Sequence, residues 1–279
     1  MEYGLVEILL RILTGAVIGF CIGMTGVGGG SIVVPTLTFG FGMTPSVSVG
    51  TASLYTFLTK IYATFRHVRL QTINYRIAFI FLAGAIPGNV MASWYVNQRA
   101  ASGMDEAERA LFQSNLKLFI AMAMLASASM LILNLIQTRH RKNAENGEQA
   151  ASQADKTQVV PIGKLLLGIL LGLCVGGIVG STALGAGVLA IPVLILCYSV
   201  STSQGIGSSI LIGLVLTLIS SLIYSKGNQI HIPTAVFMSL GSIVGVYYGS
   251  KMTVMLSEAR LKMVVIGIII IASCLMFFK

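Results

Sequence analysis

Long apolar runs, separated by short polar segments, follow one another along nearly the whole chain, five in each half. In the first half they cover 5–23, 27–41, 44–65, 77–96 and 116–136; in the second they cover 162–180, 183–199, 203–224, 233–250 and 261–278. Because about 20 apolar residues in a helix cross the hydrocarbon core of a bilayer, most of these runs are typical of membrane-spanning helices. The pattern predicts an all-α polytopic membrane protein with eight to ten membrane segments.

Two of the runs, 27–41 and 183–199, are short for a full crossing. Residues 5–41 cannot form one straight helix, since at about 1.5 Å per residue it would be far longer than a ~30 Å core. We therefore expect a break near the cluster of Gly26, Gly28, Gly29 and Gly30. The short run after it either re-enters the membrane or crosses it as a broken helix.

The runs divide the chain into a first transmembrane repeat (1–136), a polar cytoplasmic linker (137–160) and a second transmembrane repeat (161–279). The linker mixes both charges with Ala, Gln and Asn, a composition typical of mobile segments. The two halves match at an offset of 157, which pairs Thr25 with Thr182, Gly28 with Gly185, Gly30 with Gly187 and Pro35 with Pro192. Before the glycine cluster an offset of 153 pairs Gly15 with Gly168 and Gly19 with Gly172, which requires four extra residues in the second copy.

Basic residues cluster in the segments 66–76, 139–142 and 251–262, which the positive-inside rule places in the cytoplasm. If the short runs cross, each half has five spans, the second half is inverted and all three segments lie inside. If the short runs re-enter, the halves are parallel and 251–262 faces outward. We favour the inverted arrangement.

Composition excludes the soluble classes. The chain is 55% hydrophobic and 10% charged, whereas soluble domains are about 25% charged. The net charge of +9 fits cytoplasmic loops of a multi-pass protein of the cell (inner) membrane better than nucleic-acid binding. The four cysteines lie in apolar runs without a CxxC or Cys/His pair, so we predict no metal site and no cofactor. The expected partners are the lipid bilayer and a small anionic substrate, and the oligomeric state stays open, a homo-oligomer included.

Acidic residues are missing from the apolar blocks: none occurs between 8 and 104 or between 156 and 257. Transporters coupled to protons or cations usually keep an Asp or Glu inside the bilayer. An anion site needs no acid, although a cation site made only of carbonyl oxygens stays an alternative, as does an ion-coupled importer of another small solute. Since there is no HExxH and no embedded acid pair, we do not expect an enzyme.

The segment GMTGVGGGSIVVPTL (23–37) and its counterpart STALGAGVLAIPVL (181–194) resemble the TauE/SafE family of sulfite and organosulfonate exporters. The resemblance covers nearly the whole chain. It implies a membrane transporter, an exporter or permease, of small sulfur-containing oxyanions.

Glycine-rich breaks suit an oxyanion because they expose unpaired backbone amides at the start of the next helix, where the helix dipole is positive. Neighbouring hydroxyl groups can add hydrogen bonds. The predicted substrate-binding residues are Thr25, Gly28, Gly29, Gly30, Ser31, Thr51, Ser53, Thr182, Gly185, Gly187, Ser208 and Ser209. For any one of them, helix packing is an alternative role, since small residues let membrane helices approach closely.

Two further polar residues lie in apolar runs. Lys60 stands six residues before Arg66, so its ammonium either extends to the cytoplasmic interface or attracts anions. Asn89 either lines the substrate path or makes a hydrogen bond between helices.

Overall fold

The computed structural model describes residues 4–25, 30–145, 162–198, 200 and 202–252, together with 267, 270, 273 and 274. Within these ranges every regular element is helical. The first half contains α1 (Leu5–Thr25), α2 (Gly30–Pro35) continued by a π-helix η1 (Thr36–Gly40), α3 (Pro45–Arg69), α4 (Tyr75–Ala101) and α5 (Glu106–Glu145). The second contains α6 (Ile162–Thr182), α7 (Ala186–Tyr198), α8 (Thr202–Lys226) and α9 (Ile232–Met252).

Six of the described helices, α1, α4, α5, α6, α8 and α9, are long and apolar enough to cross a membrane. Nine of the ten apolar runs coincide with helices, which confirms the all-α membrane fold; the run 261–278 lies almost entirely outside the described residues. The stretch Gly30–Gly40 has 11 residues, so as a helix it reaches only about 16 Å, roughly half of the hydrocarbon core. The short run at 27–41 is therefore confirmed as shorter than a full helical span.

The polarity of the fold is the reverse of that of a soluble protein. Apart from Glu7 near its start, the most exposed side chains of α1 are apolar: Leu5, Val6, Leu9, Leu10, Leu13 and Val17. The buried set instead includes many Ser and Thr residues. An apolar exterior around a hydroxyl-rich interior is what a lipid solvent selects, because buried polar groups find partners between helices. The chain is a multi-pass membrane protein.

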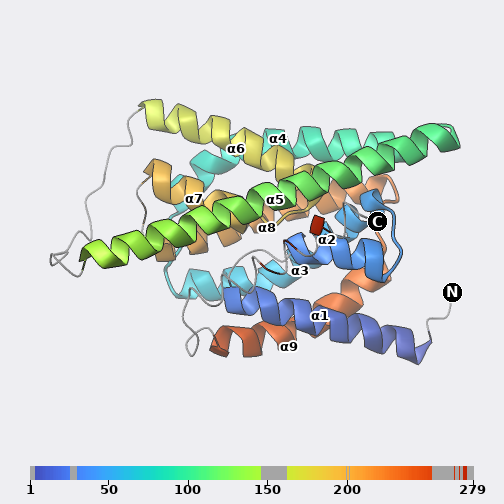
Figure 1. The fold of residues 1–279 in the computed structure, drawn as a ribbon, viewed down its shortest axis with the longest axis horizontal. Helices are drawn as coiled ribbons and strands as arrows, with labels where there is room; N and C mark the ends of the chain where they lie inside the picture. Colours follow the sequence, from blue (N-terminus) through green and yellow to red (C-terminus); the bar gives the residue numbers. More distant parts are fainter. Residues whose placement is uncertain are drawn as a thin grey trace.

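Three helix pairs make the body of the molecule: α1 with α9, α4 with α6, and α3 with α8. Figure 1 shows the first pair along the lower edge, the second along the upper edge and the third between them, with α5 crossing in front. In this view α1 begins on the right, beside the N-terminus, and runs to the left, whereas α6 begins on the left and runs to the right. The first helices of the two halves therefore run in opposite directions.

Glycines bring the outer pairs into backbone contact. A Cβ atom on Gly19 would lie 2.6 Å from the Cα and the backbone oxygen of Ser242, and one on Gly176 would collide with the backbone of Ala85. These glycines belong to small-xxx-small motifs, which let membrane helices approach closely. With 157 residues between equivalent positions, the contact of Gly19 with Ser242 is the counterpart of the contact of Gly176 with Ala85.

The helix boundaries repeat at one constant spacing. α1 and α6 begin and end 157 residues apart, α3 and α8 do the same, and α4 and α9 begin 157 residues apart. The offset of 153 inferred from the first glycines is therefore wrong, and Gly15 corresponds to Gly172 rather than to Gly168. Glycines recur every fourth residue in both helices, so an alignment shifted by one turn matches almost as many of them.

Helix α5 extends into the segment predicted to be a linker from residue 137. Helix α5 continues to Glu145, nine residues beyond the boundary at 136. At 40 residues the helix is about 60 Å long, twice the hydrocarbon thickness, so its polar end extends past the apolar run. Residues 146–161, which make up most of the predicted linker, lie outside the described ranges.

Candidate functional site

The start of α2 meets the connection between α6 and α7 in the interior. α6 ends at Thr182 and α7 begins at Ala186, and the connecting residues are buried. Ala183 has a φ of +52°, the left-handed conformation that an alanine adopts only at a cost. Gly30, the first residue of α2, faces this connection: a Cβ on Gly30 would collide with the carbonyl oxygen of Ala183 and would lie 2.8 Å from the amide nitrogen of Gly185.

The structure buries nearly all of the predicted site residues that it describes. Those with relative exposure of 7% or less are Ser31, Thr51, Ser53, Thr182, Ser208 and Ser209. Gly30, Gly185 and Gly187 are buried too. Gly28, Gly29 and the side chain of Thr25 lie outside what the structure describes. Buried hydroxyl groups generally have hydrogen-bond partners, and the partners of five of these six residues, all but Ser31, separate them into two groups.

In the first group the hydroxyl groups donate back to their own helix. Ser53 donates to the Val49 carbonyl at 2.9 Å, and Ser209 donates to the Ile206 carbonyl at 2.8 Å. Thr182 donates to a carbonyl of α6 and its oxygen accepts a hydrogen bond from the Leu184 amide at 3.2 Å. The Thr182 hydroxyl therefore closes the end of α6 and orders the first residues of the break.

In the second group the hydroxyl oxygens accept hydrogen bonds from the residues just before α9 and α4. The Thr51 hydroxyl oxygen accepts a hydrogen bond from the backbone amide of His231 at 2.9 Å. The Ser208 hydroxyl oxygen accepts one from the backbone amide of Asn74 at 3.0 Å. These contacts join opposite halves and are equivalent at the offset of 157. Thr51 and Ser208 thus have a structural role at the ends of α9 and α4, which sequence reasoning did not foresee.

Both of those helix starts carry a side-chain cap. The Asn74 side-chain oxygen accepts a hydrogen bond from the Ile77 amide at 3.3 Å, and the His231 Nδ1 atom accepts one from the Thr234 amide at the same distance. Such caps satisfy an amide that the helix leaves unpaired. Desolvation is the main reason why the pKa of His231 is lowered, and the neutral form is the one that can accept at Nδ1.

A polar network packs beside the break. The Ser93 hydroxyl donates to the Gly180 carbonyl at 3.0 Å and lies 3.1 Å from the Ser220 hydroxyl, which in turn contacts the Asn89 side-chain amide at 3.1 Å. The Tyr224 hydroxyl donates to the same Gly180 carbonyl at 2.8 Å. Helices α4, α6 and α8 are therefore joined by hydrogen bonds, and the inter-helix role for Asn89 is confirmed.

Lys60 lies in the interior rather than at an interface. The residue is 6% exposed and its Nζ atom is buried, so the extension of the ammonium to the cytoplasmic surface is wrong. Lys60 and Arg11 are the cations among the buried side chains of the described residues, and no carboxylate is buried there. The described acids Glu7, Asp105, Glu106 and Glu108 are all exposed. Arg11 forms an ion pair with Glu7 at 3.2 Å, so Lys60 is the buried cation that no described carboxylate neutralises.

Sequence reasoning missed two neighbours of Lys60. The hydroxyl groups of Thr56 and Thr64, one turn away on either side, are buried, and neither has a hydrogen-bond partner among the described residues. Both threonines are four residues from Lys60, a spacing that places all three side chains on one face of a helix and that can be read from the sequence.

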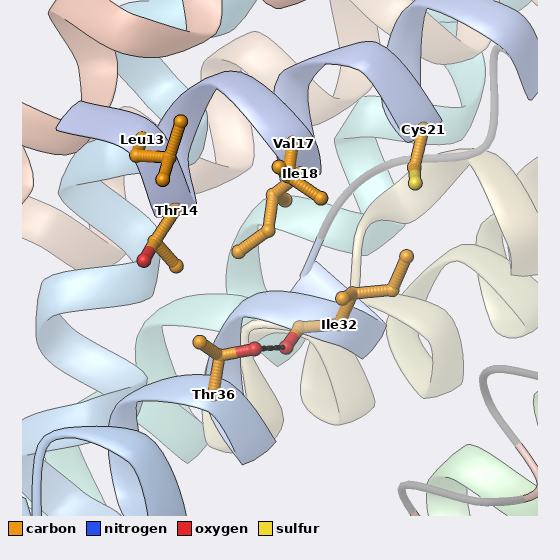
Figure 2. Close-up of a pocket in the computed structure, with 7 residues that line it drawn as sticks. All are labelled: Leu13, Thr14, Val17, Ile18, Cys21, Ile32 and Thr36. Atoms are coloured by element: carbon orange, nitrogen blue, oxygen red, sulfur yellow. Dashed lines mark hydrogen bonds between the residues drawn. The ribbon is translucent and has the colours of Figure 1, made fainter. Parts of the chain in front are cut away.

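An open cavity of about 330 Å³ lies between α1 and the segment formed by α2 and η1. Figure 2 shows its lining: Leu13, Thr14, Val17, Ile18 and Cys21 from α1, with Ile32 and Thr36. The Thr14 hydroxyl donates to the Leu10 carbonyl and the Thr36 hydroxyl to the Ile32 carbonyl, each at 2.7 Å. The cavity is therefore lined mainly by apolar groups, which do not suit an anion. Within the described ranges no cluster of His, Cys, Asp and Glu is arranged to hold a metal ion.

Comparison with known proteins agrees with this architecture. Residues 11–276 match the family described as sulfite exporter TauE/SafE. The probable membrane transporter protein YjnA of Bacillus subtilis is 27% identical over 262 residues, which cover 94% of this chain and 96% of that protein. The probable membrane transporter protein YunE of the same organism is 23% identical, covering 88% and 86% of the two chains.

A third relative comes from an archaeon. The probable membrane transporter protein MJ0441 of Methanocaldococcus jannaschii is 24% identical over 274 residues, 93% of this chain and 91% of its own. No solved structure matches the chain. Since the family match spans almost every helix, the chain belongs to the sulfite exporter TauE/SafE family of membrane transporters.

Proposed function

We propose that the chain exports small sulfur-containing oxyanions, such as sulfite or organosulfonates, and that the anion binds between two inverted repeats where their helix breaks meet. The observation that carries the proposal is the contact of Gly30 with the Ala183–Gly185 connection. It brings the start of α2 to the start of α7, so that the short helices of opposite halves begin at one place in the interior.

Inverted repeats are supported by four separate features. The helix boundaries repeat at 157 residues, the two capped helix starts are equivalent, and the glycine contacts of the outer pairs are equivalent. In addition, α1 and α6 run in opposite directions (Figure 1). Transporters with this architecture bind substrate at the repeat interface near the bilayer midplane, often at interrupted helices.

The chemistry of the break favours an anion. The first amides of a helix lack partners within the helix, and its N-terminus carries roughly half of a positive elementary charge. α7 has 13 residues and begins directly after the buried connection. Because the described interior contains buried cations and no buried carboxylate, a bound anion meets no like charge there. These features suit an oxyanion better than a cation or a sugar.

The direction of transport follows from charge. A monovalent anion leaving a cell that is negative inside moves downhill by roughly 2.3 kcal/mol per 100 mV. Export therefore needs no coupling ion, whereas concentrative uptake would need one. The scarcity of acids in the apolar blocks agrees with export.

The test is efflux of sulfite from proteoliposomes that hold the purified chain. A potassium gradient with valinomycin sets the potential, and the sulfite that leaves is measured over time, with an organosulfonate, sulfate and chloride in parallel. We expect an inside-negative potential to accelerate sulfite efflux. Transport of an amine or a sugar with no movement of any sulfur oxyanion would overturn the proposal and favour the ion-coupled importer.

A matched pair of variants connects the flux to the break. Thr182→Val removes the hydroxyl that orders the break, whereas Thr14→Val removes one that only bonds to its own helix at the outer cavity. Loss of a buried hydrogen bond costs about 1–3 kcal/mol, so we expect Thr182→Val to slow efflux roughly 5- to 150-fold. Thr14→Val should leave it unchanged, and equal rates in the two variants would remove the break from the transport path.

A further inference from the structure

One face of α3 carries a row of polar groups with no visible partner. Thr56, Lys60 and Thr64 follow one another at intervals of four, the spacing that places side chains above each other on a helix. They are 1%, 6% and 8% exposed. The two hydroxyl oxygens and the Lys60 Nζ atom are buried without a hydrogen-bond partner in the part of the chain that the structure describes.

This row faces α8. A Cβ atom on Gly213 would collide with the Nζ atom of Lys60, so the ammonium lies directly over the backbone of Gly213. Gly50, nearer the start of α3, instead faces Tyr224, nearer the end of α8. The two helices are therefore antiparallel, and Lys60 lies within about one turn of the position at which α3 meets its own counterpart in α8. Between inverted repeats, that position lies close to the bilayer midplane.

A lysine in this place requires a counter-charge. An ionised side chain buried without a partner loses several kcal/mol of hydration energy, and lysine is among the residues that a membrane interior tolerates least. The described carboxylates are exposed and belong to the start of α1 and to the segment around the start of α5. A small anion that enters from solution can supply the missing charge.

We propose that Thr56, Lys60 and Thr64 form an anion-binding site between α3 and α8, with the Lys60 ammonium as the counter-charge of a small oxyanion. The ammonium has three donors and each threonine adds one, so the row can bind several oxygens of one anion. Gly213 is the residue that leaves space for the ammonium. The identity of the anion, a sulfur oxyanion, rests on the proposed function; the site itself does not. The site adds a charged donor to the proposed transport path, in which the other hydrogen-bond donors are neutral amides and hydroxyls.

The experiment measures anion binding and stability on the purified full-length chain in lipid nanodiscs. The probe is sulfite, with sulfate, phosphate and chloride as further probes, and the dissociation constant is obtained by titration calorimetry. We expect Lys60→Met to weaken sulfite binding about 10- to 100-fold, the range for a charge-assisted hydrogen bond. Lys226→Met, at an exposed lysine at the end of α8, is the matched control and should bind like the original chain.

Thermal unfolding separates this role from a structural one. Replacing an unpaired buried charge by an apolar side chain is neutral or stabilising, so Lys60→Met without anion should unfold at the same temperature as the original chain or higher. Sulfite should raise the unfolding temperature of the original chain and of Lys226→Met, and should raise that of Lys60→Met less. A structural lysine would give the opposite result, a lower unfolding temperature with the anion effect retained.

The hydroxyl groups provide a second variant that preserves shape. Thr56→Val with Thr64→Val should weaken sulfite binding about fivefold or more while Thr14→Val does not, and this comparison decides the matter if Lys60→Met does not fold. If sulfite binds equally to every variant, the site is overturned and the proposed function stands. If another probe binds in a Lys60-dependent way while sulfite does not, the site stands and the proposed substrate is wrong. Absence of binding by every probe overturns both.

Discussion

Gly30→Ala tests the contact between the start of α2 and the connection of α6 to α7. The added Cβ atom would collide with the Ala183 carbonyl oxygen and would lie 2.8 Å from both the Ala183 carbonyl carbon and the Gly185 amide nitrogen. Carbon atoms at their best separation are about 3.5–4.0 Å from a neighbour, so the two segments must separate by roughly 1 Å. All of the opposing atoms belong to the backbone, and no rotation of a side chain relieves the collision.

The magnitude follows from this geometry. Overpacking of a tightly packed interior costs about 1–3 kcal/mol, which lowers the ratio of folded to unfolded chain about 5- to 150-fold. A separation of the breaks would also displace the first amides of α7 from the place where the proposed anion binds. We therefore expect a lower unfolding temperature and sulfite efflux at least about tenfold slower, measured by circular dichroism in nanodiscs and in proteoliposomes.

Gly40→Ala is the matched control, since it changes a glycine at the other end of the same segment. Its Cβ atom would lie 3.7 Å from the Thr36 Cγ2 atom, an ordinary contact, and Gly40 is exposed. This variant should unfold and transport like the original chain. If Gly30→Ala and Gly40→Ala behave alike, Gly30 does not touch the Ala183–Gly185 connection as the structure has it, and the reasoning that places the anion there fails.

Three further changes test the architecture. Gly19→Ala and Gly176→Ala occupy equivalent contacts, so each should lower the unfolding temperature by a similar amount; a large inequality would contradict the repeat. Ala183→Gly should raise the unfolding temperature, because glycine avoids the roughly 1–2 kcal/mol cost of a left-handed alanine. Because the folded chain lowers the pKa of His231, stability should fall as the pH drops below about 6.5, the value in an unfolded chain. His231→Asn keeps a capping oxygen for the Thr234 amide and should remove that pH dependence in thermal unfolding.

The helices could be predicted from sequence because an apolar run of membrane length has few alternatives. The runs 44–65 and 203–224 became α3 and α8 with boundaries shifted by a few residues. The break near Thr182 could be expected for the same reason, since the run after it is too short for a full crossing. Local composition determined these features, and no long-range contact was needed to find them.

The register of the repeat could not be fixed in the same way. In both first helices glycine recurs with the period of one turn, so a shift of four residues preserves most matches. The offset of 157 is given by the helix boundaries, and the glycine contacts agree with it, as Gly19 touches Ser242 and Gly176 touches Ala85. Those contacts join segments that are far apart in the sequence.

The candidate site was predicted in part for a related reason. Gly30 and the residues around Gly185 were both named as site residues from the sequence, and the structure brings Gly30 against the Ala183–Gly185 connection. The helix-capping role of Thr51 depends on a loop 180 residues away, and the burial of Lys60 depends on Gly213 in α8. Because Arg66 is only six residues away, the sequence suggested that Lys60 reaches the cytoplasmic membrane interface. The packing of α3 on α8 instead determines where the Lys60 ammonium lies.

The same packing explains why the two halves differ at this point. At the offset of 157 the counterpart of Lys60 is Thr217, and the counterpart of Thr56 is Gly213, the residue that makes space for Lys60. An unaltered duplication of Lys60 would place two ammonium groups close to the position at which the repeats meet, where their repulsion would be strong in a medium of low dielectric constant. The first half therefore holds the cation, and Gly213 of the second half leaves the space for it. A single unpaired charge needs only one anion to neutralise it, which is the stoichiometry that the proposed site predicts for sulfite in the calorimetric titration.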